Sequence, residues 1–167
     1  MSRTDPVFEA VAAAGSPFEI GERDGMRQFV NAPSDLNMLI EAVRMHGEKD
    51  CIVEGDRRLS YNDIFVLRDA LAGQLDIKRG EHVAICMRNR AEWMIGFLAI
   101  IRAGGVAALV NSRGAPEELV AAIDNVDARL VLADPDRAEM LREGGYTGSI
   151  IAADDFPEEG DAPVGLE

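Results

Sequence analysis

The fold is decided by residues 82–110, which read HVAICMRNRAEWMIGFLAIIRAGGVAALV. The apolar run at 82–87 predicts a buried strand. Residues 91–103 predict a helix that ends at Gly104-Gly105, and residues 106–110 predict a second apolar strand. We place four apolar side chains of this helix on one face: Met94, Phe97, Leu98 and Ile101. A strand, a helix and a strand in this order indicate a βαβ unit with a right-handed crossover.

The same alternation continues towards the C-terminus. Pro116 suits the first position of a helix, and the acidic residues after it suit the positive end of the helix dipole. Residues 130–133 predict another strand, residues 136–142 a short helix, and residues 149–153 a last strand. We therefore expect further parallel strands beside the first two.

A helix, a hairpin and a second helix precede this unit. The first helix is expected over residues 34–47, and the hairpin joins residues 51–54 to residues 57–59. The second helix begins at Ser60, with Asp63 placed to complete a capping box. The whole pattern predicts an α/β fold: a mostly parallel sheet with helices on both faces, preceded by a helix and a short β-hairpin.

Three segments are expected along the chain. Residues 1–33 form a weakly patterned N-terminal arm, and residues 34–153 form the α/β domain. Residues 154–167 carry six acidic side chains and no basic one, with two prolines and two glycines, so they predict an acidic linker.

The chain is acidic, with a formal net charge of −13 from 17 basic and 30 acidic residues. Nucleic acids bind through lysine and arginine, so we expect no nucleic-acid partner. No apolar run approaches the ~18 residues of a membrane span, and the first residues lack the basic segment followed by an apolar one that is typical of a signal peptide. We expect no stable membrane insertion and a cytoplasmic protein. Cys51 and Cys86 lie in strand-like runs and are expected to be buried and free.

The common motifs of catalysis and nucleotide binding are missing from these residues. The sequence contains neither GxGxxG nor GxxxxGK[ST], and its only lysines are Lys49 and Lys78. His46 falls at a predicted helix end and His82 at a strand start, and neither lies near a nucleophile elbow. The cysteines form no CxxC pair. We therefore assign no catalytic residue and no metal ligand.

One loop retains a functional interpretation. Asn111, Ser112 and Arg113 follow the carboxyl end of a predicted strand and precede a helix. Ligands of open α/β sheets bind on that side of the sheet. Arg113 is placed to meet an anion there, while the alternative is a plain connecting loop with an exposed arginine.

Ordered pieces between residues 59 and 132 resemble the N-terminal subdomain of the AMP-forming acyl-CoA synthetases and related adenylating enzymes. The pieces are 59–63 (LSYND), 80–85 (GEHVAI), 89–93 (NRAEW), 97–106 (FLAIIRAGGV), Asn111, 115–119 (APEEL) and 127–132 (DARLVL). The resemblance covers roughly residues 30–155. Arg88 and Val110 depart from it, because the family often has proline at each of these positions.

This resemblance implies an enzyme that joins a fatty or aryl carboxylic acid to ATP and then passes the acyl group to coenzyme A (CoA), with Mg²⁺ as a further cofactor. The family's phosphate loop and catalytic residues follow the stretch seen here. The chain is therefore expected to be an inactive N-terminal part that packs on a second α/β subdomain and a C-terminal domain of the same protein. The loop matching Asn111, Ser112 and Arg113 approaches the CoA nucleotide in CoA-forming relatives.

Other functions stay open at this point. One alternative is an adenylation domain that loads a carrier protein, or an oxidative relative within the same superfamily. Another is a stand-alone interaction module without chemistry. The resemblance also implies that the isolated subdomain exposes the apolar patch that packs on the second subdomain in the family, so we expect the isolated chain to self-associate into a homo-oligomer.

Overall fold

The computed structural model describes residues 5–33 and 35–158 of the chain. These residues belong to two compact units, Met1–Glu41 and Ala42–Glu167. The sequence analysis ended the arm earlier, at residue 33. Helix α2, Leu36–Ala42, lies at the junction, and the N–H of Met38 donates to Asp35 Oδ1 in its first turn. Ser34, which we also expected at this helix start, falls outside the described residues.

The first unit contains secondary structure that the sequence analysis did not assign. Helix α1, Pro6–Val11, is capped by Asp5, and strands β1, Ile20–Arg23, and β2, Met26–Phe29, pair antiparallel. The two-residue loop between the strands is Asp24-Gly25, and both residues have positive φ, 53° and 76°. Asp-Gly favours this kind of hairpin loop, so the signal was present in the sequence.

The second unit begins with the expected hairpin and helix. A 3-10 helix, η1 (Val43–His46), leads to strands β3, Asp50–Glu54, and β4, Arg57–Ser60, which pair antiparallel. Helix α3, Tyr61–Gln74, follows directly. Its predicted capping box is confirmed: the Asp63 N–H donates to Ser60 Oγ at 3.1 Å, and the Ser60 N–H donates to Asp63 Oδ2 at 2.8 Å.

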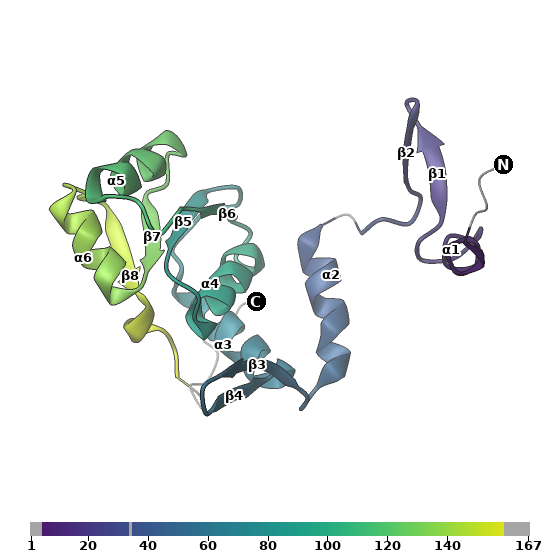
Figure 1. Ribbon diagram of the computed structural model, residues 1–167, viewed down its shortest axis with the longest axis horizontal. Helices are drawn as coiled ribbons and strands as arrows, with labels where there is room; N and C mark the ends of the chain where they lie inside the picture. Colours follow the sequence, from purple (N-terminus) through teal and green to yellow (C-terminus); the bar gives the residue numbers. More distant parts are fainter. Residues whose placement is uncertain (1–4, 34, 159–167) are drawn as a thin grey trace. The chain divides into compact units, whose positions relative to one another are not determined.

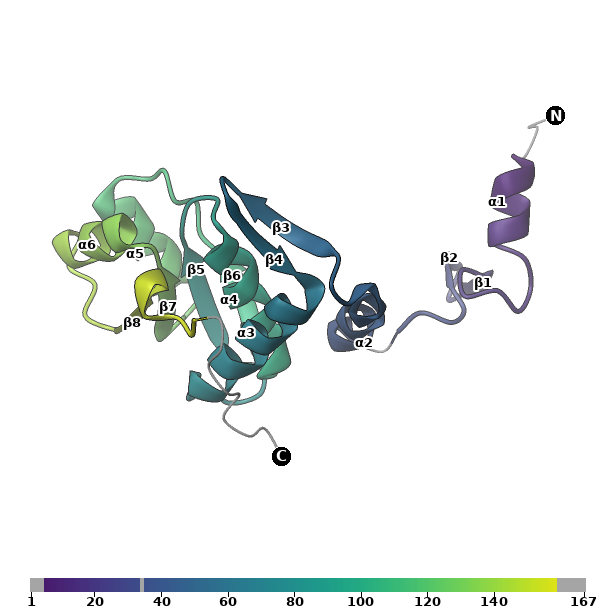
Figure 2. The same ribbon diagram turned by 90° about the horizontal axis from the view of Figure 1, so that it is seen from below.

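A four-stranded parallel sheet forms the centre of the second unit (Figures 1 and 2). The strand order is β6-β5-β7-β8. The strands are β5 (His82–Cys86), β6 (Val106–Leu109), β7 (Leu130–Ala133) and β8 (Ser149–Ala152), and the connecting helices are α4 (Ala91–Arg102), α5 (Pro116–Asn125) and α6 (Pro135–Glu143). Every neighbouring pair is parallel, which confirms the predicted α/β fold.

Helices cover both faces of this sheet, as predicted. Side chains alternate across a strand, so Val83 and Ile85 of β5 pack with α3 and α4, while Ala84 and Cys86 pack with α5 and α6. Figure 1 shows α5 and α6 on one side of the sheet and α3 and α4 on the other. The core is thus two apolar layers separated by the sheet.

The face of α4 that packs inward is not the one predicted. Ile95, Ala99 and Ile100 are buried, whereas Met94 is 39% exposed. The helix is apolar on all sides, so its periodicity does not select a buried face. The buried face is decided instead by contact with the sheet, where Gly96 lies so close to β7 that a Cβ on it would be 2.9 Å from Leu132 Cδ1. A close approach of α4 to β7 needs the glycine.

The predicted linker starts too early in the sequence. Ala153–Asp155 forms a second 3-10 helix, η2, and Phe156 is 7% exposed and packs into the core with α4. Burial of the aromatic ring of Phe156 stabilises the fold. It does not require burial of the neighbouring carboxylates, since Asp154 and Asp155 stay exposed. Residues 159–167 of the predicted linker lie outside the described residues.

Candidate functional site

At the carboxyl edge of the sheet, the loops that follow the strands turn towards opposite faces. The chain leaves β5 for α4 on one face, and it leaves β6 and β7 for α5 and α6 on the other. Loops that separate in this way open a crevice beside the strand ends, and ligands of open α/β sheets bind there. Two cavities lie along this edge.

The first cavity lies beyond the ends of β5 and β6 and is lined by Arg88, Asn89, Ser112 and Arg113. Its volume is about 210 Å³. Two of these residues belong to the predicted loop, and the other two follow β5. The structure therefore brings together two loops that are separated in the sequence by the whole of α4 and β6.

A buried ion pair holds both loops in place. Asp134 is 6% exposed, and its Oδ2 accepts a hydrogen bond from the N–H of Arg88 at 2.8 Å. Arg137 is 9% exposed, and its Nε donates to the carbonyl oxygen of Ser112 at 3.0 Å. Asp134 Oδ1 caps α6 by accepting from the Arg137 N–H at 2.9 Å and lies 3.6 Å from Arg137 Nη1. The two loops are thus fixed to the start of α6.

Cys86 lies directly behind this ion pair. Its side chain is fully buried, and this burial, helped by the negative charge of Asp134, raises the pKa of the thiol to about 11 although Arg137 opposes the shift. A thiol with such a pKa is protonated near neutral pH and is a poor nucleophile. Cys86 therefore supports the loops by packing and not by chemistry.

The guanidinium groups of Arg88 and Arg113 stay available at the cavity. Both residues are exposed, and within residues 5–33 and 35–158 neither side chain has an acidic partner. The backbone of Arg113 is oriented by its neighbour, because the Arg113 N–H donates to Asn111 Oδ1 at 3.2 Å. Asn111 thus shapes the loop, while Ser112 and Arg113 face the cavity.

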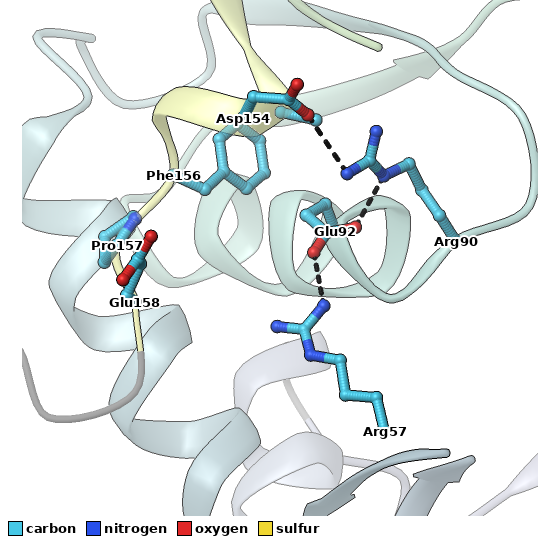
Figure 3. Close-up of a pocket in the computed structure, with 8 residues that line it drawn as sticks. Arg57, Arg90, Glu92, Asp154, Phe156, Pro157 and Glu158 are labelled. Carbon is cyan, nitrogen blue, oxygen red and sulfur yellow. Dashed lines mark hydrogen bonds and ion pairs between the residues drawn. The ribbon is translucent and has the colours of Figure 1, made fainter. Parts of the chain in front are cut away.

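The second cavity lies beyond the ends of β5 and β8 and has a volume of about 520 Å³ (Figure 3). Charged residues from three elements surround it. Glu92 accepts hydrogen bonds at 2.6 Å from Arg57 Nη1 of the hairpin and from Arg90 Nε, and Arg90 Nη2 donates to Asp154 Oδ1 at 3.2 Å. Figure 3 shows Phe156 beside this chain of ion pairs. The network ties the hairpin, α4 and η2 together.

Glu92 is ionised in this network. Burial alone raises the pKa of a carboxyl group, but the hydrogen bonds from Arg57 and Arg90 outweigh it, so the pKa of Glu92 lies below its usual value. A carboxylate that is already bound by two guanidinium groups is a weak proton acceptor. Glu92 therefore holds structure together and is a poor candidate for a general base.

Sequence reasoning found one of the two loops at the first cavity. Asn111, Ser112 and Arg113 were singled out, and their binding role stays a prediction. Arg88 was noted only as a departure from a family pattern, and Asp134 was given no role. Asp134-Pro135 after an apolar strand is a helix-start signal, but no local pattern indicates that its carboxylate reaches Arg88.

No helix within residues 5–33 and 35–158 is long and apolar enough to cross a membrane. The same residues contain no group of three or more histidine, cysteine, aspartate or glutamate side chains that is arranged to hold a metal ion.

Comparison with known proteins decides the family. A sequence profile described as "AMP-binding enzyme" matches residues 39–164, which include the whole sheet and both cavities. The chain belongs to the AMP-binding enzyme family. The resemblance inferred from the ordered pieces of sequence is thereby confirmed.

The relatives of this chain carry the names of different enzymes. A medium/long-chain-fatty-acid–CoA ligase, FadD6, of Mycobacterium tuberculosis is 25% identical over 80% of this chain. The nonribosomal peptide synthetase nlsA of Emericella nidulans is 24% identical over 63% of it. The chain spans 23% and 2% of the lengths of these two relatives. It therefore corresponds to a small part of each.

A solved structure supports the fold of this family member. The N-terminal domain of FACL13 from Mycobacterium tuberculosis superposes with a TM-score of 0.66 and 20% sequence identity. The superposition covers 74% of this chain and 35% of that one. The match confirms the fold, a parallel sheet flanked by helices like that of the N-terminal subdomain of such proteins.

Proposed function

We propose that this chain is the N-terminal part of an ATP-dependent carboxylic acid–CoA ligase of the cytoplasm. The observation that carries the proposal is the family match over residues 39–164, together with the likeness to a fatty-acid–CoA ligase over 80% of the chain. A reaction in two steps follows: the carboxylate attacks ATP to form an acyl-adenylate and pyrophosphate, and the CoA thiol then displaces AMP to form a thioester. A fatty or aryl acid is the proposed substrate.

The described residues fit one part of this reaction better than the other. The cavity at Arg88 and Arg113 suits an anionic group such as a phosphate of CoA. Mg²⁺ that accompanies ATP is held by carboxylates, and residues 5–33 and 35–158 contain no group of three or more histidine, cysteine, aspartate or glutamate side chains arranged to hold a metal ion. We therefore assign Asn111, Ser112 and Arg113 to the CoA side and place the ATP site in other segments of the protein.

The chain by itself is then expected to be inactive. Acyl-adenylate formation needs charge stabilisation around the phosphates in the transition state, and these residues do not supply it. The test compares the 167-residue chain with the full-length protein in carboxylate-dependent ATP–pyrophosphate exchange, with a panel of fatty and aryl acids. Exchange by the full-length protein alone supports the proposal, and exchange by neither contradicts the ligase function.

A second candidate is adenylation for a carrier protein. The likeness to the nonribosomal peptide synthetase nlsA favours it. The two functions share the first step and differ in the acceptor of the acyl group. A thioester assay with CoA and with a phosphopantetheinylated carrier protein separates them. A stand-alone interaction module would show neither step.

A further inference from the structure

A group of positive charges lies at the amino edge of the sheet, the edge opposite the cavity at Arg88 and Arg113. Lys78 and Arg79 come shortly before β5, and Arg129 directly precedes β7. Because β5 and β7 are parallel neighbours in the sheet, these two loops lie side by side. They border a cavity of about 440 Å³ that is lined by Lys78, Arg79, Glu81, His82, Asp127 and Arg129. This volume falls within the roughly 300–1,000 Å³ of small-molecule sites.

The three cations at this cavity are not used by the fold. In the part of the chain that the structure describes, the side chains of Lys78, Arg79 and Arg129 make no ion pair and no hydrogen bond. Helix dipoles do not explain their position either. Helices α3 and α5 end at Gln74 and Asn125 and have no basic residue in the last turn, and the effect of a dipole falls off within that turn. The three cations are therefore available to an anion.

Two carboxylates also line the cavity and limit its positive charge. Glu81 is engaged in its own turn, where its Oε2 accepts a hydrogen bond from the Lys78 N–H at 2.9 Å. Asp127 is exposed and has a positive φ of 51°. The three cations thus exceed the two carboxylates in a chain whose formal net charge is −13. This local excess favours an anion, and Asp127 weakens the binding of that anion by repulsion.

Both loops are held in position by the surrounding backbone. The Gly80 N–H donates to the carbonyl oxygen of Gly104 at 2.8 Å, which ties the first loop to the segment between α4 and β6. His82 Nδ1 donates to the carbonyl oxygen of Val126 at 2.6 Å, which ties the start of β5 to the second loop. The stem of Arg79 packs on Gly104, where an added Cβ would lie 3.6 Å from Arg79 Cγ. A site that is ordered in advance loses less entropy on binding.

We propose that Lys78, Arg79 and Arg129 bind a small anion with two or more phosphate groups, of which pyrophosphate is the smallest. Guanidinium groups bind phosphate oxygens in pairs, and lysine adds a point charge. The cations come from two loops, so a ligand with linked phosphate groups reaches more of them than a single phosphate does. The binding site goes beyond the proposed ligase function and does not depend on it.

The test follows the amide NMR signals of the isotope-labelled 167-residue chain during a titration with sodium pyrophosphate. Inorganic phosphate is titrated in parallel, and so is ATP without a metal ion. Sodium chloride at equal ionic strength controls for general screening. Lys78→Ala and Arg129→Ala each remove a cation from one loop. Lys49→Ala is the matched control, because this exposed lysine lies beside the start of α3, while the cavity follows the end of that helix.

We expect saturable changes at residues 78–82 and 127–129, with a Kd for inorganic phosphate about tenfold above that for pyrophosphate. Lys78→Ala and Arg129→Ala should each raise the Kd for pyrophosphate about tenfold, which corresponds to about 1.4 kcal/mol. Lys49→Ala should leave it unchanged. A lower Kd for ATP than for pyrophosphate identifies the ligand as a nucleotide, and an equal or higher one identifies it as a free polyphosphate.

A further variant is expected to bind more tightly than the wild type. Asp127→Asn removes the repelling charge and should lower the Kd for pyrophosphate about threefold. Asparagine also tolerates a positive φ, so the loop keeps its conformation. A merely structural role of the loop does not predict this gain.

Other outcomes overturn the proposal. Signal changes that sodium chloride reproduces, or that do not saturate, indicate screening and not a site. Changes confined to residues 88–89 and 112–113 place the anion at the opposite edge of the sheet. An unchanged Kd in Lys78→Ala and Arg129→Ala, or an unchanged or raised one in Asp127→Asn, excludes binding by these charges.

Discussion

The carboxylate of Asp134 accepts a hydrogen bond at 2.8 Å from the backbone N–H of Arg88, which lies 46 residues earlier in the chain. This contact joins the ends of β5 and β7 on the side of the sheet where ligands bind. It also leaves the Arg88 side chain free to act at the cavity. A single buried acid thus positions one of the two charges on which the proposed acceptor site depends.

Replacing Asp134 by alanine should destabilise the second unit. The change removes the cap of α6 and leaves the partly buried N–H of Arg88 without its acceptor, and together these losses cost about 2–4 kcal/mol. Urea unfolding followed by the fluorescence of Trp93, the single tryptophan, measures the effect. Asp136→Ala removes an exposed neighbouring acid and should cost less than about 0.5 kcal/mol. Equal losses in the two variants would contradict the buried role of Asp134.

Replacing Glu92 by glutamine should have an effect that depends on pH. Because the folded-state pKa of Glu92 is lowered, its ionisation stabilises the fold above the ordinary carboxyl pKa, and this contribution is lost as pH falls through the folded-state value. The partial exposure of Arg57 and Arg90 limits the gain to about 1 kcal/mol. Urea unfolding at a series of pH values from 7 downwards should show the largest difference in unfolding free energy from wild type at pH 7, and this difference should shrink as the pH falls below the ordinary carboxyl pKa. Asp76→Asn, at an exposed position, serves as the control.

The two cysteines should differ in reactivity. Cys86 is fully buried with a pKa of about 11, so roughly a thousandth of it is thiolate at pH 8, whereas Cys51 is half-buried. Mass spectrometry after brief treatment with iodoacetamide at pH 8 should find modification at Cys51 first. Cys86 should react only after denaturation. Equal modification of both residues in the native protein would show that the ion pair of Asp134 and Arg137 opens readily.

Self-association of the isolated chain should depend on the edge strand β6. Among the strands that the structure describes, β6 pairs with β5 alone, and Leu109 and Val106 are 58% and 44% exposed. Lysine on an edge strand opposes pairing with another chain, so Leu109→Lys should reduce the mass measured by light scattering at high concentration. Val66→Lys, on α3, is the control because Val66 is also partly exposed. A monomeric wild type would remove the basis for this prediction.

The order of helices and strands was predictable because it depends on local chemistry. The capping box of Ser60 and Asp63, the glycines after α4 and α6 and the apolar strands each act within a few residues. The family followed from the same local pieces in their order. Asp24-Gly25 belongs with them, since its loop type was readable and was overlooked.

The candidate site depended on tertiary structure because its parts are distant in sequence. The strand order places β7 beside β5, and only this pairing brings Asp134 to Arg88 and Arg137 to Ser112. The buried face of α4 was decided in the same way, by its contact with the sheet. Local sequence determined which elements form and which family they belong to. The packing of those elements decided which charges are neutralised and which remain free to bind a ligand, since charge pairing is set by distance in space.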